Sequence, residues 1–222
     1  MYTINVNGKD YTVEEDKKLL SFLRDDLRFT SVKDGCSEGA CGTCTVLVDG
    51  QKVKACVQKV SKFEGKKILT VEGLTEREKQ VYEHCFAEAG AVQCGFCIPG
   101  MVISAKSLLD VNNNHTLDDV KKAIKGNICR CTGYKKIEEA ILMAAKFFRE
   151  NLEIPEEPKE LRMNQRYKRP DVAEKVNGTG TFVDDIVLPG MIYAKAVRSK
   201  YPRAKINKID ISKALKHTDC VR

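Results

Sequence analysis

The sequence predicts an α+β protein, in which a small sheet domain comes first, a helical domain follows and an incomplete unit ends the chain. Three observations predict this order. Apolar and polar residues alternate around two hairpin turns, Asn7–Gly8 and Asp49–Gly50. From Thr75 onward, apolar residues recur at helical spacing. A charged stretch with three prolines, residues 152–170, then precedes a tail that is too short to bury a core of its own.

Residues 1–74 are predicted to form the sheet domain. The alternation indicates one β-hairpin over residues 2–13, a second over residues 45–55 and a last strand over residues 67–71. Between the hairpins, the apolar residues of 19–27 fall at helical spacings without Gly or Pro, which predicts an amphipathic helix. We expect this helix to cover one face of the sheet.

Residues 75–151 are predicted to form a domain of four helices. Gly90 is suited to end the first helix, and Pro99 is suited to the first turn of the second. Thr116 and Asp119 have the spacing of a capping pair at the start of the third. The expected helices cover residues 76–89, 99–109, 116–126 and 137–151.

The last part of the chain is predicted to contain a linker, residues 152–170, and the N-terminal piece of a further domain, residues 171–222. Strands are expected at 191–197 and 206–211 because both segments are rich in apolar residues. We expect residues 171–222 to be disordered without a partner, since they offer little apolar surface to bury.

Composition and charge exclude several classes of function. The net charge is +7, and residues 159–222 hold 15 Lys and Arg against 7 Asp and Glu. These basic residues lack interleaved aromatic residues, so we expect no nucleic-acid partner. The chain has no stretch of about 18 apolar residues and no signal-like start, which predicts a cytoplasmic chain without a membrane span. Ten cysteines in such a chain indicate metal binding or redox chemistry rather than disulfides.

The first cysteine motif consists of Cys36, Cys41, Cys44 and Cys56. Its spacing matches the plant-type [2Fe-2S] site, in which four thiolates complete the coordination of two irons. Gly35, Gly39 and Gly42 lie between or beside these ligands, where a tight loop must bring backbone N–H groups close to an anionic cluster. Iron-sulfur binding is therefore favoured over the alternatives, a zinc site or buried thiols.

The second cysteine motif consists of Cys94, Cys97, Cys129 and Cys131. One pair precedes a predicted helix and the other pair lies in the loop before the next, so the four thiols are expected to meet between helices. A [2Fe-2S] cluster, a zinc site and a redox disulfide all remain open on spacing alone. No nucleophile and base stand at catalytic spacing, so we assign no catalytic residue.

Three segments of the chain, GCSEGACGTCTVLVDG, GAVQCGFCIPGM and GNICRCTGY, resemble the iron-sulfur part of the molybdenum hydroxylases, the xanthine dehydrogenase and aldehyde oxidoreductase family. The resemblance implies a ferredoxin-like β-grasp domain and a four-helix domain, each with one [2Fe-2S] cluster. Residues 175–206 are similar to the start of the family's α/β molybdopterin-binding domain, which accounts for the incomplete tail.

The resemblance also implies an order of electron transfer. Electrons would pass from the molybdopterin centre to the proximal cluster, in the helical domain, then to the distal cluster, in the ferredoxin-like domain, and on to a flavin or another acceptor on another chain. Gln93 and Cys131 would contact the molybdopterin. A catalytic subunit that binds the molybdenum cofactor and a separate FAD-binding chain are the implied partners, so the chain is not catalytically complete alone. The alternative is a free ferredoxin-like electron carrier or a redox sensor.

Overall fold

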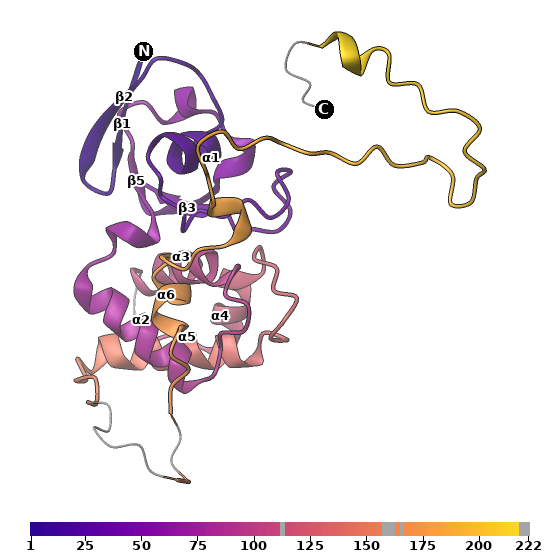
Figure 1. The fold of residues 1–222 in the computed structure, drawn as a ribbon. Helices are drawn as coiled ribbons and strands as arrows, with labels where there is room; N and C mark the ends of the chain where they lie inside the picture. The colour runs from indigo at the N-terminus through magenta and orange to yellow at the C-terminus, as the bar shows by residue number, and fades with distance from the viewer. Residues whose placement is uncertain (112–113, 157–162, 165–166, 218–222) are drawn as a thin grey trace. The chain divides into compact units, whose positions relative to one another are not determined.

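The structure is a computed structural model that describes residues 1–111, 114–156, 163–164 and 167–217 (Figure 1). It contains both strands and helices, as the sequence predicts. Contacts divide the chain into two units, Met1–Asp185 and Ile186–Arg222.

The first unit begins with a five-stranded sheet in the order β2-β1-β5-β3-β4. Its strands are β1 (Tyr2–Val6), β2 (Lys9–Val13), β3 (Thr45–Val48), β4 (Gln51–Lys54) and β5 (Lys67–Leu69). β5 pairs in parallel with β1 and antiparallel with β3, and so joins the two hairpins into one sheet. Asn7–Gly8 and Asp49–Gly50 have positive φ at both positions, as a type I′ hairpin turn requires. Both predicted hairpins are therefore confirmed.

A helical segment packs against this sheet, but it is not the single α-helix that the sequence predicts. α1 (Leu19–Ser21) runs directly into a π-helical turn, η1 (Phe22–Asp26). The backbone N–H of Leu27 donates to the carbonyl of Phe22, five residues earlier, at 3.1 Å. The wider turn keeps four apolar side chains of five consecutive residues in the core with the sheet residues. These four side chains belong to Leu19, Leu20, Phe22 and Leu23.

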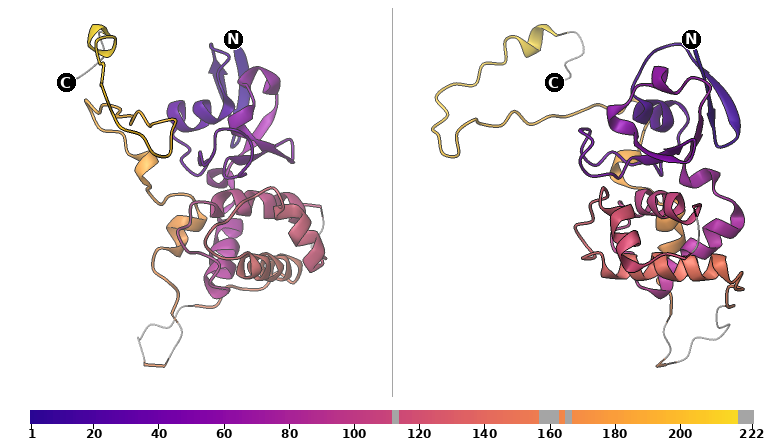
Figure 2. Two further views of the ribbon diagram at one scale, coloured as in Figure 1. Left: turned by 90° about the vertical axis from the view of Figure 1, so that its right-hand side faces the viewer. Right: turned by 180° about the vertical axis from the view of Figure 1, so that it is seen from behind.

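The helical part follows the prediction closely. It consists of α2 (Glu76–Glu88), α3 (Ile98–Leu109), α4 (Leu117–Ile124) and α5 (Lys135–Arg149), which Figures 1 and 2 show packed together. Thr116 and Asp119 form the predicted capping box, and Thr75 and Glu78 form a second one at α2. Pro99 lies in the first turn of α3. Apolar faces of all four helices meet in one core.

β3 connects the two cores because all four of its residues are buried. Val46 and Val48 pack in the core between the sheet and α1, whereas Leu47 packs in the helical core. Successive side chains of a strand point to opposite faces, so the three consecutive apolar residues Val46, Leu47 and Val48 can serve two cores. The sheet and the helices thus share a boundary along β3 and α3.

Residues 171–185 pack on the helical part, so the prediction of disorder is wrong for this segment. α6 (Val172–Val176) lies against α2 and α3, and the 3₁₀ turn η5 (Val183–Asp185) follows it (Figure 2). Val172 and Val176 are four residues apart and both are buried in the helical core. This pair supplies the apolar face that the sequence analysis overlooked.

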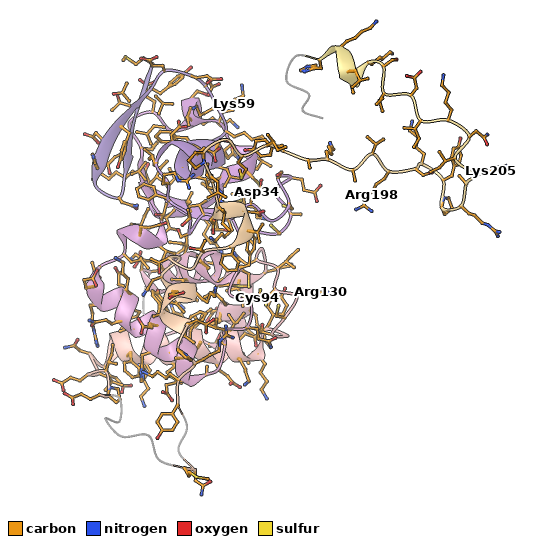
Figure 3. All side chains as sticks on the ribbon, in the orientation of Figure 1. Asp34, Lys59, Cys94, Arg130, Arg198 and Lys205 are labelled. Atoms are coloured by element: carbon orange, nitrogen blue, oxygen red, sulfur yellow. The ribbon has the colours of Figure 1, made fainter. Side chains whose placement is uncertain are left out.

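The second unit, residues 186–217 as described, forms no strand, so the predicted strands at 191–197 and 206–211 are wrong. Its side chains, including Arg198 and Lys205, extend from the backbone into solvent (Figure 3). Val197 is fully exposed, and no strand of this unit lies beside it to pair. A short 3₁₀ turn, η6 (Ala214–Lys216), is its one regular element among the described residues.

Two further sequence predictions concern the rest of the chain. The predicted linker, residues 152–170, falls partly on residues 157–162 and 165–166, which lie outside the described residues. No helix in the described part of the chain is long and apolar enough to cross a membrane.

Candidate metal centres

The first cysteine motif is assembled by one loop and one short turn. Cys36, Cys41 and Cys44 lie in the loop before β3, and Cys56 lies in the 3₁₀ turn η2 (Ala55–Val57) after β4. The backbone N–H of Cys41 donates to the sulfur of Cys36 at 3.4 Å. The side chains of Cys44 and Cys56 interact with each other. The structure therefore brings the four predicted ligands together as two pairs.

The loop around Cys36 fits an anionic metal cluster. Backbone N–H groups of Cys41, Glu38 and Ala40 hydrogen-bond to the sulfur of Cys36 and lower its pKa to about 7. Its thiolate, the form that binds iron, is therefore accessible at neutral pH. A Cβ atom at Gly35 would lie 3.0 Å from the sulfur of Cys41, closer than side chains normally approach. Gly35 thus leaves the space in which these sulfurs can turn toward a metal.

The pKa of Cys44 is shifted upward by burial, whereas hydrogen bonds shift that of Cys36 downward. Burial raises the pKa of the Cys44 thiol to about 12, so the free chain holds Cys44 protonated. A bound cationic metal would supply the charge that makes a buried thiolate stable, with release of the proton.

The second cysteine motif is assembled between helices. Cys97 is the residue that precedes α3, and Cys129 and Cys131 lie in the loop between α4 and α5. The sulfurs of Cys94, which is labelled in Figure 3, and Cys131 are 3.6 Å apart, and both residues are exposed. Cys97 and Cys129 are buried and their side chains interact. The structure thus brings these thiols together as two pairs, and their joint ligation of one cluster stays a prediction.

In the buried pair of the second motif, the pKa values of Cys97 and Cys129 are shifted in opposite directions. Burial raises the pKa of Cys97 well above its usual range. Burial also acts to raise the pKa of Cys129, but hydrogen bonds from the hydroxyl and backbone N–H of Thr132 outweigh it, so this pKa is lowered. Cys129 is therefore the more readily ionised thiol of the two.

The arrangement of the thiols in pairs fits a site that holds two metal ions better than a site that holds a single ion. A structural zinc takes four ligands, whereas each iron of a [2Fe-2S] cluster takes only two thiolates. The pairs Cys36–Cys41 and Cys44–Cys56 of the first motif suit the second arrangement.

The two motifs are in direct contact through their loops. The backbone N–H of Ile128, the residue before Cys129, donates to the carbonyl of Cys41 at 2.7 Å. The side-chain amide of Asn127 donates to the carbonyl of Gly42 at 2.9 Å. A Cβ atom at Gly42 would lie 2.2 Å from the carbonyl oxygen of Gly126, so only glycine permits this approach. The loop that holds one set of thiols is therefore hydrogen-bonded to the loop that holds the other.

Several residues of these sites escaped the sequence analysis. Thr43 lies with its hydroxyl 3.2 Å from the sulfur of Cys41, and Thr132 has the same relation to Cys129 at 3.1 Å. Both threonines stand within three residues of a cysteine in the sequence, which is a signal that could have found them. Asn127 is buried between the loops, and nothing in its sequence context indicates that. Gln93, the predicted molybdopterin contact, is exposed beside Cys94.

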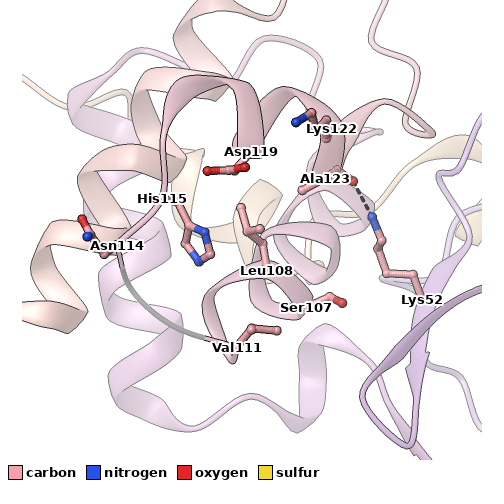
Figure 4. A pocket seen from close by; sticks show the side chains of 9 residues that line it. All are labelled: Lys52, Ser107, Leu108, Val111, Asn114, His115, Asp119, Lys122 and Ala123. Atoms are coloured by element: carbon pink, nitrogen blue, oxygen red, sulfur yellow. Dashed lines mark hydrogen bonds between the residues drawn. The ribbon is translucent and has the colours of Figure 1, made fainter.

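A separate cavity of about 520 Å³ lies between the end of α3, α4 and β4 (Figure 4). Lys52 reaches it from β4 and donates to the backbone carbonyl of Ala123 at 2.6 Å. None of the eight predicted ligand cysteines lines this cavity.

Comparison with known proteins decides the family. The 2Fe-2S iron-sulfur cluster binding domain matches residues 4–70, and the [2Fe-2S] binding domain matches residues 70–142. The nicotinate dehydrogenase small FeS subunit of Eubacterium barkeri is 46% identical over 146 residues, which cover 64% of this chain and 93% of that protein. This chain belongs to the iron-sulfur subunits of the molybdenum hydroxylases. The zinc and disulfide alternatives for the second motif are thereby set aside, because each motif falls in a [2Fe-2S] domain.

The iron-sulfur subunit also resembles larger relatives. The aldehyde oxidoreductase of Megalodesulfovibrio gigas is 37% identical over 228 residues, which cover 96% of this chain and 25% of that protein. The crystal structure of the aldehyde oxidoreductase from Desulfovibrio desulfuricans superposes with a TM-score of 0.76 at 37% identity, over 83% of this chain and 22% of that one. The a/b hammerhead domain of aldehyde oxidase and xanthine dehydrogenase matches residues 177–222. The iron-sulfur subunit thus spans about a quarter of these oxidoreductases, and the predicted family resemblance is confirmed.

Proposed function

We propose that this iron-sulfur subunit relays single electrons from a molybdopterin centre through the helical site and then the ferredoxin-like site to a flavin or another acceptor on another chain. The observation that carries the proposal is the hydrogen bond between the carbonyl of Cys41 and the N–H of Ile128, because it joins the two ligand loops directly. When bound, the two [2Fe-2S] clusters supply one-electron acceptors and donors. The protein supplies the ligands, the spacing and the electrostatics.

The proposed ligands are four thiols for each cluster. The distal cluster would be held by Cys36, Cys41, Cys44 and Cys56, and the proximal cluster by Cys94, Cys97, Cys129 and Cys131. Hydrogen bonds to these sulfurs, such as that from the N–H of Thr132 to Cys129, tune a cluster's potential. The exposed side of the helical site, with Gln93 and Cys131, is the proposed contact with the molybdopterin.

We further propose four segments and two partners. Residues 1–74 form the β-grasp domain, 75–151 the four-helix domain, 152–170 a linker and 171–222 the start of an α/β molybdopterin-binding domain. The match of residues 177–222 to the a/b hammerhead domain supports the last assignment. The partners are a catalytic chain or part with the molybdenum cofactor and a separate FAD-binding chain, working in the cytoplasm, where thiols stay reduced.

EPR spectroscopy of the purified protein tests the relay. After reduction with dithionite, we expect two distinguishable [2Fe-2S] signals, and in the complex one of them is magnetically coupled to Mo(V). A single signal, or zinc in the helical site by elemental analysis, would overturn the proposal. Size-exclusion chromatography tests the competing idea of a free carrier, for which the native protein would elute alone and without molybdenum.

A further inference from the structure

A segment of this chain, residues 171–185, here called the strap, lies across both iron-sulfur domains. On the helical side it contributes Val172 and Val176 to the core beside α2 and α3. On the sheet side, the hydroxyl of Thr30 lies 3.5 Å from the carbonyl of Gly178. One short segment thus contacts both domains that carry cysteine motifs.

The end of the strap is held to the sheet domain by a buried ion-pair triad. Asp185 accepts from the ammonium group of Lys33 at 2.6 Å and from the guanidinium group of Arg24 at 2.8 Å. The side chains of Asp185 and Lys33 are only 5% and 1% exposed. Leaving either charge buried without its partner is costly, so these contacts fix the strap strongly.

Phe182 in the strap contacts residues of both ligand loops. The ammonium group of Lys33 lies 4.6 Å from the centre of the Phe182 ring. The ring of Phe96, which lies between Cys94 and Cys97, meets Phe182 edge to face at 5.2 Å. Phe182 therefore lies between the loop of the helical site and the residue that begins the loop of the ferredoxin-like site.

Lys33 is connected to that first site by its backbone. Its carbonyl accepts a hydrogen bond from the hydroxyl of Thr43 at 3.0 Å, and the same hydroxyl lies 3.2 Å from the sulfur of Cys41. A shift of Lys33 would therefore move a polar group that contacts a ligand sulfur.

Two glycines show how closely the strap is fitted. A Cβ atom at Gly178, which has φ +74°, would lie 2.3 Å from the Cβ atom of Ser31 in the sheet domain. A Cβ atom at Gly95, between Cys94 and Cys97, would lie 2.6 Å from the side chain of Lys175 in the strap. Added atoms at either position would push the strap away from a domain that it contacts.

We propose that the strap is a positioning element that fixes the two cluster loops relative to each other and sets the charge near the ferredoxin-like cluster. The proposal rests on the function proposed above. Asp185 offsets one of the two positive charges of Lys33 and Arg24, and the backbone of Lys33 is linked through Thr43 to the sulfur of Cys41. The rate of electron transfer between clusters depends on their separation, which gives this fit a functional consequence.

Matched variants of the chain with both clusters bound test the proposal. Gly178→Ala adds the clashing atom, and Gly190→Ala is its control because Gly190 has a similar φ of +73° and nothing within 4 Å of its Cβ position. Asp185→Asn removes the charge at nearly constant size, and Asp184→Asn is its exposed control. Each protein is examined by EPR for spin coupling between the two reduced clusters, by redox titration and by tryptic cleavage at Lys175.

We expect Gly178→Ala to weaken and broaden the coupling and to speed cleavage at Lys175 by about tenfold, while Gly190→Ala leaves both unchanged. Asp185→Asn is expected to shift the potential of the ferredoxin-like cluster upward, because two cations lose their counter-charge. If the Gly178→Ala chain fails to bind clusters, the comparison of Asp185→Asn with Asp184→Asn tests the proposal by itself. Coupling and potentials equal to those of the controls would overturn the strap proposal. Absence of a cluster from the unmodified chain would instead overturn the proposed function.

Discussion

The carbonyl of Cys41 accepts a hydrogen bond from the backbone N–H of Ile128 at 2.7 Å. Cys41 is a proposed ligand of the distal cluster, and Ile128 precedes Cys129, a proposed ligand of the proximal cluster. The contact is short in space but joins residues far apart in the sequence. It joins the two loops whose cysteines are the proposed ligands of the two clusters.

Removal of this hydrogen bond is expected to weaken the coupling between the clusters. Ile128→Pro eliminates the donor N–H, whereas Ile128→Ala retains it, and Ile128 itself is 53% exposed, so either variant loses little packing. We expect the proline variant to lose about 1–3 kcal/mol of stability, because the carbonyl of Cys41 is left without its partner. EPR of the reduced protein measures the coupling, and equal coupling in the two variants would show that the hydrogen bond is dispensable.

Close packing at Gly42 predicts a specific sensitivity to an added methyl group. Gly42→Ala and Gly50→Ala carry the same backbone cost, because φ is +72° and +80°, but only Gly42 has an atom within 4 Å of its Cβ position. We expect Gly50→Ala to cost about 1–2 kcal/mol and Gly42→Ala a further 1–3 kcal/mol or so. The rate of cluster loss in denaturant, followed by visible absorbance, compares the two. Equal rates would contradict the observed approach of the loops.

The assignment of ligands predicts which cysteines matter for iron. Cys56→Ser removes one thiolate of the ferredoxin-like site, so we expect loss of that cluster and of about half of the bound iron. Cys85→Ala is the control: Cys85 is fully buried on α2, burial raises its pKa to about 12, and its removal should cost about 1 kcal/mol without loss of iron. Iron analysis and EPR check both variants. Full iron content in Cys56→Ser would refute the assignment.

Acid is expected to release the end of the strap. Burial acts to raise the pKa of Asp185, but hydrogen bonds from Lys33 and Arg24 outweigh it and hold this pKa below the ordinary value of 3.8. Because the folded pKa is lower than the unfolded one, the stabilisation is complete above pH 3.8 and is lost as the pH falls through the folded pKa. Hydrogen exchange of residues 171–185 between pH 6 and pH 3, corrected for intrinsic rates, measures this. The Asp185→Asn chain should show no such step.

Local sequence was sufficient for most elements of the first unit. Turn pairs such as Asn7–Gly8 suit the positive φ that a hairpin turn requires. Capping pairs such as Thr116 and Asp119 provide hydrogen bonds to the helix end within four residues. Both features depend on residues that are adjacent in the chain, so the sequence predicts them. The prediction failed for residues 191–197 and 206–211. A strand exists only when another strand pairs with it, and local composition does not supply that partner.

By itself, the sequence determined the spacing of the two cysteine motifs and the glycines that a cluster loop requires, because ligand geometry depends on close neighbours in the chain. Only the tertiary structure decided which loops meet. The contacts of Ile128 with Cys41 and of Asp185 with Lys33 join residues 87 and 152 positions apart. Such contacts depend on the packing of whole domains, and no local pattern of residues encodes them.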